Sequence, residues 1–249
     1  DFRLRGIISR YSDHISLSIE MPTQDKEKQG EWETVNSGSA LWSRPKNEIS
    51  EEEYQHFYQS LSYDSEAPLA TLHNRVEGNL EYTSLFFIPQ KAPFDLWDRE
   101  QRHGINLYVR RIFIMDDAKY LMPSFLRFVR GVVDAADLPL NVSREFLQNN
   151  KDIDRIRSAS VKKILSELSR LAEKEPETYA AFWEEFGKVL KEGVVEDHDN
   201  RTVLPQYLTS EDGALSFGKQ AQGHADSKGC ETANDKFSES VFGEPIIVA

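Results

Sequence analysis

Two apolar segments constrain the fold of this chain more than any other feature of its sequence. Residues 80–88 have the sequence LEYTSLFFI, and residues 105–115 have the sequence INLYVRRIFIM. Apolar side chains are enriched on one face of each segment and partly on both. Strands with this pattern need cover on both faces. The two segments therefore predict strands inside a layered domain, not a sheet with one face in water.

Further extended and helical segments precede and separate these strands. Apolar and polar residues alternate over residues 15–21, which predicts a half-buried strand, and the charged residues 24–30 predict a loop or hairpin tip. Residues 32–42 form a second extended segment. Ser50 and Glu53 have the spacing of a capping box, and the apolar residues that follow predict a helix over residues 50–61.

The second half of the chain is predominantly helical in its pattern. Pro123 is placed to open a helix, with apolar residues up to Val133 on one stripe. Two longer amphipathic helices follow, one over residues 153–171 and one that begins at Pro176 and ends at Gly193. Strands with helices among them, followed by a run of helices, predict an α/β or α+β domain with a helical continuation.

Composition narrows the class of protein. The 249 residues include 42 acidic and 30 basic side chains, and the formal net charge of -12 opposes phosphate-backbone binding as the main activity. The single cysteine, Cys230, excludes an internal disulfide framework and a cysteine zinc site, and is typical of a reducing compartment such as the cytoplasm. The six histidines lack metal-ligand spacing. No apolar run is long enough to span a bilayer. The chain starts at Asp1, and we expect it to be a segment of a longer protein.

The last part of the chain differs from the rest. Residues 194–249 contain ten acidic and four basic residues, and five glycines and five serines, without a sustained helical or strand period. This composition predicts a loop, an appendage or disorder. Residues 213–220, GALSFGKQ, fit the phosphate-loop pattern, but Gln220 stands where a hydroxyl should bind magnesium and no buried strand precedes them. We interpret this match as chance.

The segment LPLNVSREFLQ, residues 138–148, carries the most informative pattern. Ser143 is a natural N-cap, which places Arg144 in the first turn of a helix. A cation there opposes the helix dipole unless an anion is nearby. A helix N-terminus together with a guanidinium can hold a phosphate, and Gln148 would lie on the same face. From the residues alone, a solvated arginine paired with Glu145 or Asp137 is the more frequent case.

Other arginines and two aromatic residues also have both a functional and a structural interpretation. The pairs Arg110–Arg111 and Arg127–Arg130 are expected to be salt-bridged surface groups, with Asp116, Asp117 and Asp134 as counter-charges. Trp42 and Phe94 lie next to prolines in turn-rich segments. Each is either an exposed contact point for another protein or domain, or a residue that closes the edge of the core.

Five blocks of sequence resemble one known family. They are LPLNVSREFLQ, NRVEGNLEYTSLFFIP at residues 74–89, KAPFDLW at 91–97, LYVRRIFIMDDA at 107–118 and LMPSFLRFVRGVVDAADLPLN at 121–141. In this order they resemble the middle domain of the ninety-kilodalton heat-shock chaperone family, and most of all its bacterial members. The resemblance runs from about residue 3 to residue 201. It implies an αβα layered domain, similar to the transducer domains of gyrase B and mismatch-repair ATPases, over residues 1–150, with a helical continuation over 151–201.

The resemblance also implies roles for particular residues. Arg144 would reach the γ-phosphate of ATP, with Gln148 and Asn141 in the same catalytic loop. Phe94 would contact the ATP-binding domain, and Trp42 would lie in a client-contact region. ATP, with magnesium, would be bound mainly by an N-terminal domain that this chain lacks, so the chain alone should not hydrolyse it. A C-terminal dimerisation domain would follow, making the parent a homodimer.

Residues 202–249 depart from the family pattern. A divergent segment, an artificial extension and a shifted reading frame all remain open for them. The sequence as a whole predicts a segment of a cytoplasmic, ATP-dependent chaperone that binds non-native proteins and requires neither nucleic acid nor a membrane. The alternative is the transducer domain of a DNA-handling ATPase, in which the invading side chain would be a lysine where this chain has Arg144.

Overall fold

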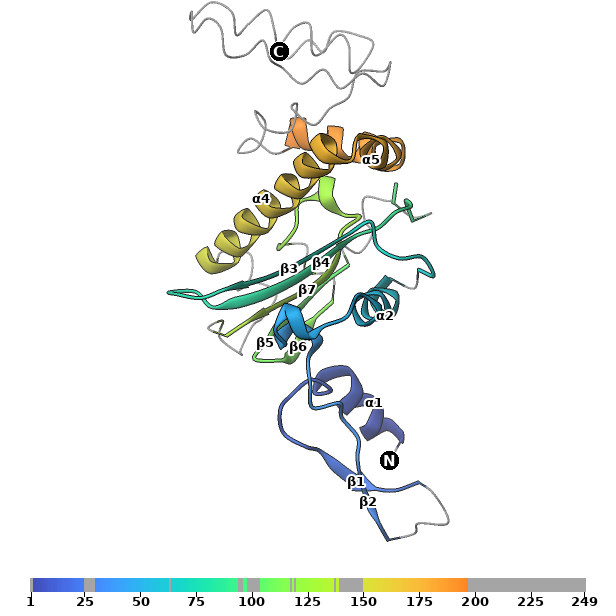
Figure 1. Cartoon of the computed structure of the whole chain (residues 1–249). Coiled ribbons are helices and arrows are strands. Elements are labelled where there is room, and N and C mark those ends of the chain that lie inside the picture. The colour runs from blue at the N-terminus through green and yellow to red at the C-terminus, as the bar shows by residue number, and fades with distance from the viewer. Residues whose placement is uncertain are drawn as a thin grey trace, which may run out of the picture. The chain divides into compact units, whose positions relative to one another are not determined.

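The structure, a computed structural model, describes residues 2–24, 30–62, 64–93, 96–97, 104–116, 118, 120–136, 138 and 150–196 (Figure 1). The chain divides into two compact units, Asp1–Leu208 and Thr209–Ala249. The predicted tail, residues 202–249, lies outside the described residues. The predicted domain boundaries at residues 150 and 201 therefore stay predictions.

A mixed five-stranded sheet forms the centre of the first unit. Its strands lie in the order β3-β4-β7-β5-β6, with β7 in the middle. Neighbouring strands are antiparallel except β5 and β7, which are parallel. The bounds are β3 Ala70–Val76, β4 Tyr82–Ile88, β5 Ile105–Val109, β6 Ile112–Met115 and β7 Arg130–Ala135. A mixed sheet flanked by helices confirms the predicted α/β class.

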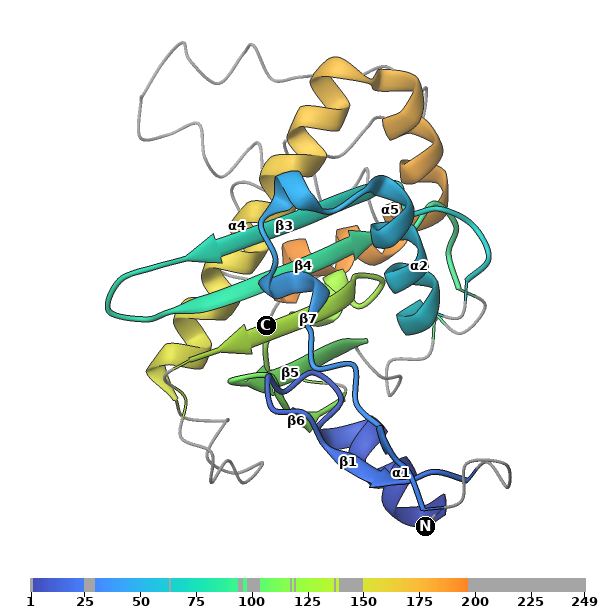
Figure 2. The same cartoon turned by 60° about the horizontal axis from the view of Figure 1, so that its bottom comes forward.

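Helices cover both faces of this sheet (Figures 1 and 2). Helix α2, Glu51–Ser62, lies on one side, whereas α4, Lys151–Lys174, and α5, Pro176–Glu196, lie on the other. In β4, Leu85 and Phe87 point toward α2, and the alternation of a strand turns Phe86 and Ile88 to the opposite face. All four side chains are fully buried. The cover that the sequence required on both faces is therefore present.

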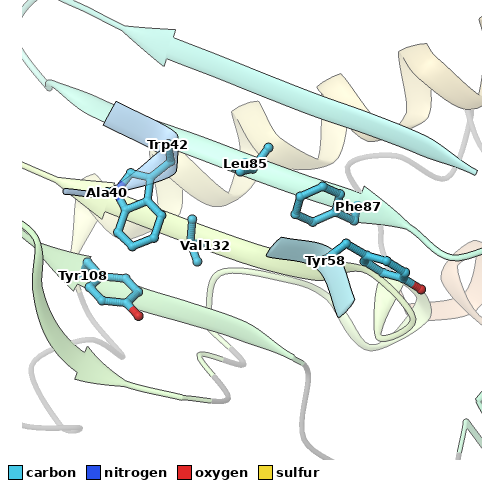
Figure 3. Packing of buried hydrophobic residues seen from close by; sticks show 7 residues of the cluster. All are labelled: Ala40, Trp42, Tyr58, Leu85, Phe87, Tyr108 and Val132. Atoms are coloured by element: carbon cyan, nitrogen blue, oxygen red, sulfur yellow. The ribbon is translucent and has the colours of Figure 1, made fainter. Parts of the chain in front are cut away.

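The cluster under α2 joins residues from distant parts of the chain (Figure 3). Its buried members come from the segment before α2, from α2 itself and from the three inner strands: Ala40, Trp42, Tyr58, Leu85, Phe87, Tyr108 and Val132. The capping box holds the start of α2, since Ser50 N donates to Glu53 Oε2 at 2.9 Å and Glu53 N donates to Ser50 Oγ at 3.2 Å. The helix predicted over residues 50–61 is confirmed.

The helix predicted after Pro123 is wrong. A single 3₁₀ turn, η4, covers Ser124–Leu126, and β7 follows as the central strand. Val132 and Val133 are both fully buried, because one faces α2 and the other faces the opposite layer. Their spacing imitates a helical stripe, but the strand gains burial on both faces and a hydrogen-bonded neighbour at each edge.

Residues 105–115 form a hairpin rather than one strand. Arg110 and Arg111 connect β5 to β6 with φ values of 50° and 66°. Tight hairpin turns of this kind usually use asparagine or glycine, because other residues rarely adopt positive φ. The backbone N–H of Arg110 donates to Ala135 O at 3.1 Å, and that of Arg111 donates to Asp134 Oδ1 at 3.1 Å. Contacts with β7 therefore stabilise a turn that the sequence does not signal.

The two long helices are confirmed, with one change at the end of α5. Asn150 caps α4 by accepting a hydrogen bond from Asp152 N at 2.8 Å, and Pro176 is the first residue of α5. Gly193 does not end α5, which runs to Glu196. A Cβ atom at Gly193 would lie 2.6 Å from Phe125 Cγ, so the glycine leaves room for the Phe125 ring against the helix.

The N-terminal segment has less regular structure than predicted. Helix α1, Phe2–Tyr11, was not predicted, and the two extended segments pair only as β1, Glu20–Pro22, and β2, Trp32–Thr34. Short 3₁₀ turns follow at Leu41–Ser43 and Lys46–Glu48. No residue of α1 is buried. Among the helices that the structure describes, none is long and apolar enough to cross a membrane.

Gly131 gives a test of the central strand. Its φ is +153°, and a Cβ atom there would lie 2.1 Å from Leu85 O. We expect Gly131→Ala to lower the free energy of unfolding by about 3 kcal/mol or more, because backbone strain and a backbone clash add. Gly6→Ala is the control: Gly6 lies in α1 with open space around it, and alanine there should be neutral or stabilising by up to about 1 kcal/mol. Equal urea midpoints for the two variants would contradict this account of β7.

Candidate functional site

Four of the five predicted site residues lie outside the described part of the chain. Asn141, Arg144 and Gln148 belong to residues 139–149, and Phe94 belongs to residues 94–95. Their predicted roles stay predictions. The structure does describe the two elements between which the Arg144 segment runs, the end of β7 and the start of α4.

The end of β7 is fixed by backbone and side-chain hydrogen bonds from two neighbouring turns. Ala136 N donates to Glu81 O at 2.9 Å, on the side of β4. On the side of β5, Arg110 N donates to Ala135 O at 3.1 Å, and Arg110 Nε donates to Ala136 O at 3.0 Å. The last residues before the Arg144 segment are therefore hydrogen-bonded on both sides of the strand.

Asp134, one residue before Ala135, joins β7 to two other segments. Its Oδ2 accepts a hydrogen bond from Trp42 Nε1 at 2.8 Å, and its Oδ1 accepts one from Arg111 N at 3.1 Å. Asp134 thus binds N–H groups of an indole and of the backbone, not the guanidinium groups that the sequence suggested as its partners. Asp116 Oδ2 lies 3.7 Å from Arg10 Nη2, in an ion pair, and Asp117 is outside the described residues.

The start of α4 fixes the other end of the Arg144 segment. Asn150 caps the helix, and Ile153 and Ile156 in the first turns are buried. The burial of these two side chains anchors the first turns of α4. Both ends of the Arg144 segment are therefore attached to the packed core.

A polar cleft of about 360 Å³ opens beside the end of β7. Its lining includes the charged side chains Arg75, Arg110, Arg111, Glu77 and Glu81. Arg75 and Glu77 form an exposed ion pair with an N–O distance of 3.0 Å. The charges are mixed, so the cleft by itself does not define a ligand. Among the described residues, no group of three or more histidine, cysteine, aspartate or glutamate side chains could hold a metal ion.

Trp42 is not an exposed contact residue. Only 1% of its surface is accessible, and its ring centroid lies 4.7 Å from that of His14 and 4.7 Å from that of Tyr108. The indole also requires a partner for its N–H, which Asp134 supplies. The alternative, that Trp42 closes the edge of the core, is correct, and its predicted place in a client-contact region stays a prediction.

His73 continues the polar contacts of the Trp42 segment. His73 Nε2 lies 2.8 Å from Trp42 O, which can only accept, so Nε2 carries the proton. Nδ1 then accepts from Tyr54 Oη at 2.7 Å. Burial lowers the pKa of His73 below its usual value of 6.5, against the opposing effect of the Trp42 hydrogen bond, and the nearby Lys46 charge lowers it further.

The sequence reasoning missed Arg127 as a buried residue. It was predicted to be a salt-bridged surface group. An ion pair with Glu192 is present, but only 3% of the Arg127 surface is exposed. The signal was present, because Arg127 stands alone between Leu126 and Phe128 in an apolar run. An arginine in such a run must either reach solvent or be buried together with ion-pair and hydrogen-bond partners.

Comparison with known proteins identifies the family. The Hsp90 protein family matches residues 20–214, which is most of the chain. The chain belongs to the Hsp90 family. Chaperone protein HtpG of Nitrosococcus oceani is 59% identical over 213 residues, which are 83% of this chain and 34% of that protein. The HtpG proteins of Hydrogenovibrio crunogenus and Idiomarina loihiensis are 54% and 52% identical, over 84% and 86% of this chain and 34% and 36% of their own lengths.

Membership of the Hsp90 family confirms the resemblance on which the sequence analysis relied. The chain spans about a third of the length of these HtpG relatives. The Hsp90 match includes residues 139–149, although the structure does not describe them. The relatives compared are named as chaperones, and none of them is named as a DNA-handling ATPase.

The lowered pKa of His73 gives a test of the buried Trp42 segment. Because the folded-state pKa lies below 6.5, the unfolded chain binds the proton more tightly. The contribution of neutral His73 to stability should be complete above pH 6.5 and should be lost as the pH falls from there toward the folded-state pKa. We expect His73→Gln to reduce this pH dependence of the free energy of unfolding, measured by urea titration. His56→Gln, an exposed histidine of α2, should retain it. An unchanged pH dependence in His73→Gln would contradict the assignment.

Proposed function

We propose that this chain is the middle segment of an ATP-dependent molecular chaperone. In this proposal it binds non-native proteins and supplies Arg144 to the γ-phosphate of ATP held by a separate N-terminal domain. The observation that carries the proposal is the Hsp90 match over residues 20–214, which contains the complete segment LPLNVSREFLQ. The named function of the HtpG relatives supports it.

The chemistry of Arg144 suits this role. Phosphoryl transfer needs positioned positive charge more than covalent chemistry, because charge is spread over the phosphate oxygens in the transition state. A guanidinium can donate two parallel hydrogen bonds to such oxygens, and the N–H groups of a helix N-terminus add further donors. The side-chain amides of Asn141 and Gln148 would orient the same loop. ATP is the substrate here, and its magnesium would enter with it.

The described structure supports a precise delivery of Arg144. A catalytic group must be held within a fraction of an ångström of its productive position, and rigid elements achieve this better than loops alone. The end of β7 is held by hydrogen bonds with Arg110, Arg111 and Glu81, and Asn150 caps the start of α4. The loop between them therefore starts and ends on elements of the core.

Exposed apolar side chains support contact with another domain of the same protein. Phe2 is 87% exposed, Leu4 is 54% exposed and Trp32 is 65% exposed. Exposed apolar side chains are candidates for protein–protein contact. We propose that the N-terminal ATP-binding domain is the partner, that a C-terminal domain dimerises the parent, and that the parent acts in the cytoplasm.

The role of Arg144 can be tested in a chimera. Residues 20–214 would replace the matching segment of the Nitrosococcus oceani HtpG protein, and ATP turnover would be measured with and without Arg144→Ala. We expect kcat to fall by about tenfold or more, because one lost donor to the transferred phosphate costs at least that much. Arg157→Ala, an exposed arginine on α4, is the matched control and should leave kcat unchanged. Normal turnover in Arg144→Ala would contradict the proposed function.

A further inference from the structure

Arg127 connects three segments through one buried guanidinium. Its Nε donates to Leu96 O at 2.7 Å, and its Nη1 donates to Ser124 O at 2.9 Å. Nη1 and Nη2 also donate to the two carboxylate oxygens of Glu192 on α5, at 2.8 and 3.0 Å. The guanidinium thus joins the segment before β5, the η4 turn and the helical layer.

Helix α5 makes two more contacts with the same segment. Glu185 Oε2 accepts a hydrogen bond from Ala92 N at 2.9 Å. Lys188 Nζ lies 5.7 Å from the centroid of the Trp97 ring, within the range of a cation–π contact. Glu185, Lys188 and Glu192 follow at i, i+3 and i+7, so they share one face of α5. We call these three residues and Arg127 the α5 latch.

Burial of the Arg127 charge carries a desolvation penalty, which indicates a specific role for the latch. A buried charge destabilises a fold unless its hydrogen bonds are satisfied, and an apolar side chain of similar size is often as stable. Leu126 and Phe128, on either side of Arg127, are fully buried, so an apolar residue would be compatible with the site. What an apolar residue could not do is bind Leu96 O and Glu192 together.

Two neighbouring described residues of the segment held by the latch, Leu96 and Trp97, differ in exposure. Leu96 is 1% exposed, and its N–H donates to Pro93 O at 3.0 Å, which closes a turn. Trp97, the next residue, is 53% exposed. The latch therefore fixes the backbone at Ala92 and Leu96 while the Trp97 indole remains accessible.

We infer that the α5 latch positions Ala92, Leu96 and Trp97 for contact with the ATP-binding domain. The inference rests on the proposed function, in which Phe94 of this segment meets that domain. Arg127, Glu185 and Glu192 act as positioning residues, because they act through the backbone at Ala92 and Leu96. Weakening the latch should lower the probability of a productive encounter between the domains. It should reduce kcat while leaving the KM for ATP unchanged, because the nucleotide pocket lies on the other domain.

The first part of the test measures the latch itself by hydrogen exchange on this chain. Arg127→Lys keeps the charge but cannot supply the fork, and Glu185→Ala removes one acceptor from a half-buried position. We expect amides of residues 92–97 to exchange about tenfold faster in Arg127→Lys, the effect of losing one hydrogen bond to a charged group. A smaller increase is expected in Glu185→Ala, which should fold even if Arg127→Lys does not. Glu184→Ala, an exposed neighbour on α5, is the control.

The second part measures ATP turnover of the same variants in the HtpG chimera. Faster exchange at residues 92–97 together with a lower kcat and an unchanged KM supports the inference. Unchanged exchange, or faster exchange with the kcat of the Glu184→Ala control, overturns it. If Arg144→Ala abolishes turnover while the latch variants are normal, only this inference fails. If Arg144→Ala turns over normally, the role of Arg144 fails, and the latch variants still decide whether Ala92, Leu96 and Trp97 are positioned for the domain contact.

Discussion

The double burial of β7 is the constraint on which the rest of the structure depends. Val132 packs in the cluster under α2, and Val133 faces the opposite layer, so the strand requires helices on both sides. Gly131 allows β7 to approach Leu85 O closely at its start. At its other end, Asp134 and Ala135 accept hydrogen bonds from the Arg110–Arg111 turn. The strand that leads to the Arg144 segment is thus packed on both faces and hydrogen-bonded along both edges.

This arrangement links packing to the proposed chemistry. An arginine that must reach a phosphate on another domain is positioned more precisely when its loop is anchored to rigid elements. The β7 end and the capped start of α4 provide two such attachments. The α5 latch provides a third, on the segment proposed to meet the same domain. The helical layer therefore contributes to the proposed activity through Glu185 and Glu192 as well as through its core.

The sequence predicted the parts of the fold that local patterns determine. The capping box at Ser50 and Glu53, the strand at β4, the start of α5 at Pro176 and the course of α4 all depend on neighbouring residues, and all were predicted. The helix predicted over residues 124–133 was wrong, and the turn within the strand region 105–115 was missed, because both conformations depend on partners far away in the sequence. Arg110 and Arg111 adopt positive φ where Ala135 O and Asp134 Oδ1 of β7 accept hydrogen bonds from their backbone N–H groups. Val132 and Val133 form a strand only between β4 and β5.

For the candidate site, too, long-range partners were the part that the sequence did not reveal. The resemblance identified the Hsp90 family correctly. The burial of Trp42 could not be predicted from its neighbours in the sequence, because its hydrogen-bond partner Asp134 is 92 residues away. Arg127 was missed because Leu96, Ser124 and Glu192 come together only in the folded chain.

Hydrogen exchange of the HtpG chimera with bound nucleotide tests the central claim most directly. With a non-hydrolysable ATP analogue, the account predicts slower exchange across residues 139–149 than with ADP, and equal exchange in β7 and α4 in both states. Equal exchange of residues 139–149 with the two nucleotides would contradict the claim that a fixed core delivers this segment to ATP.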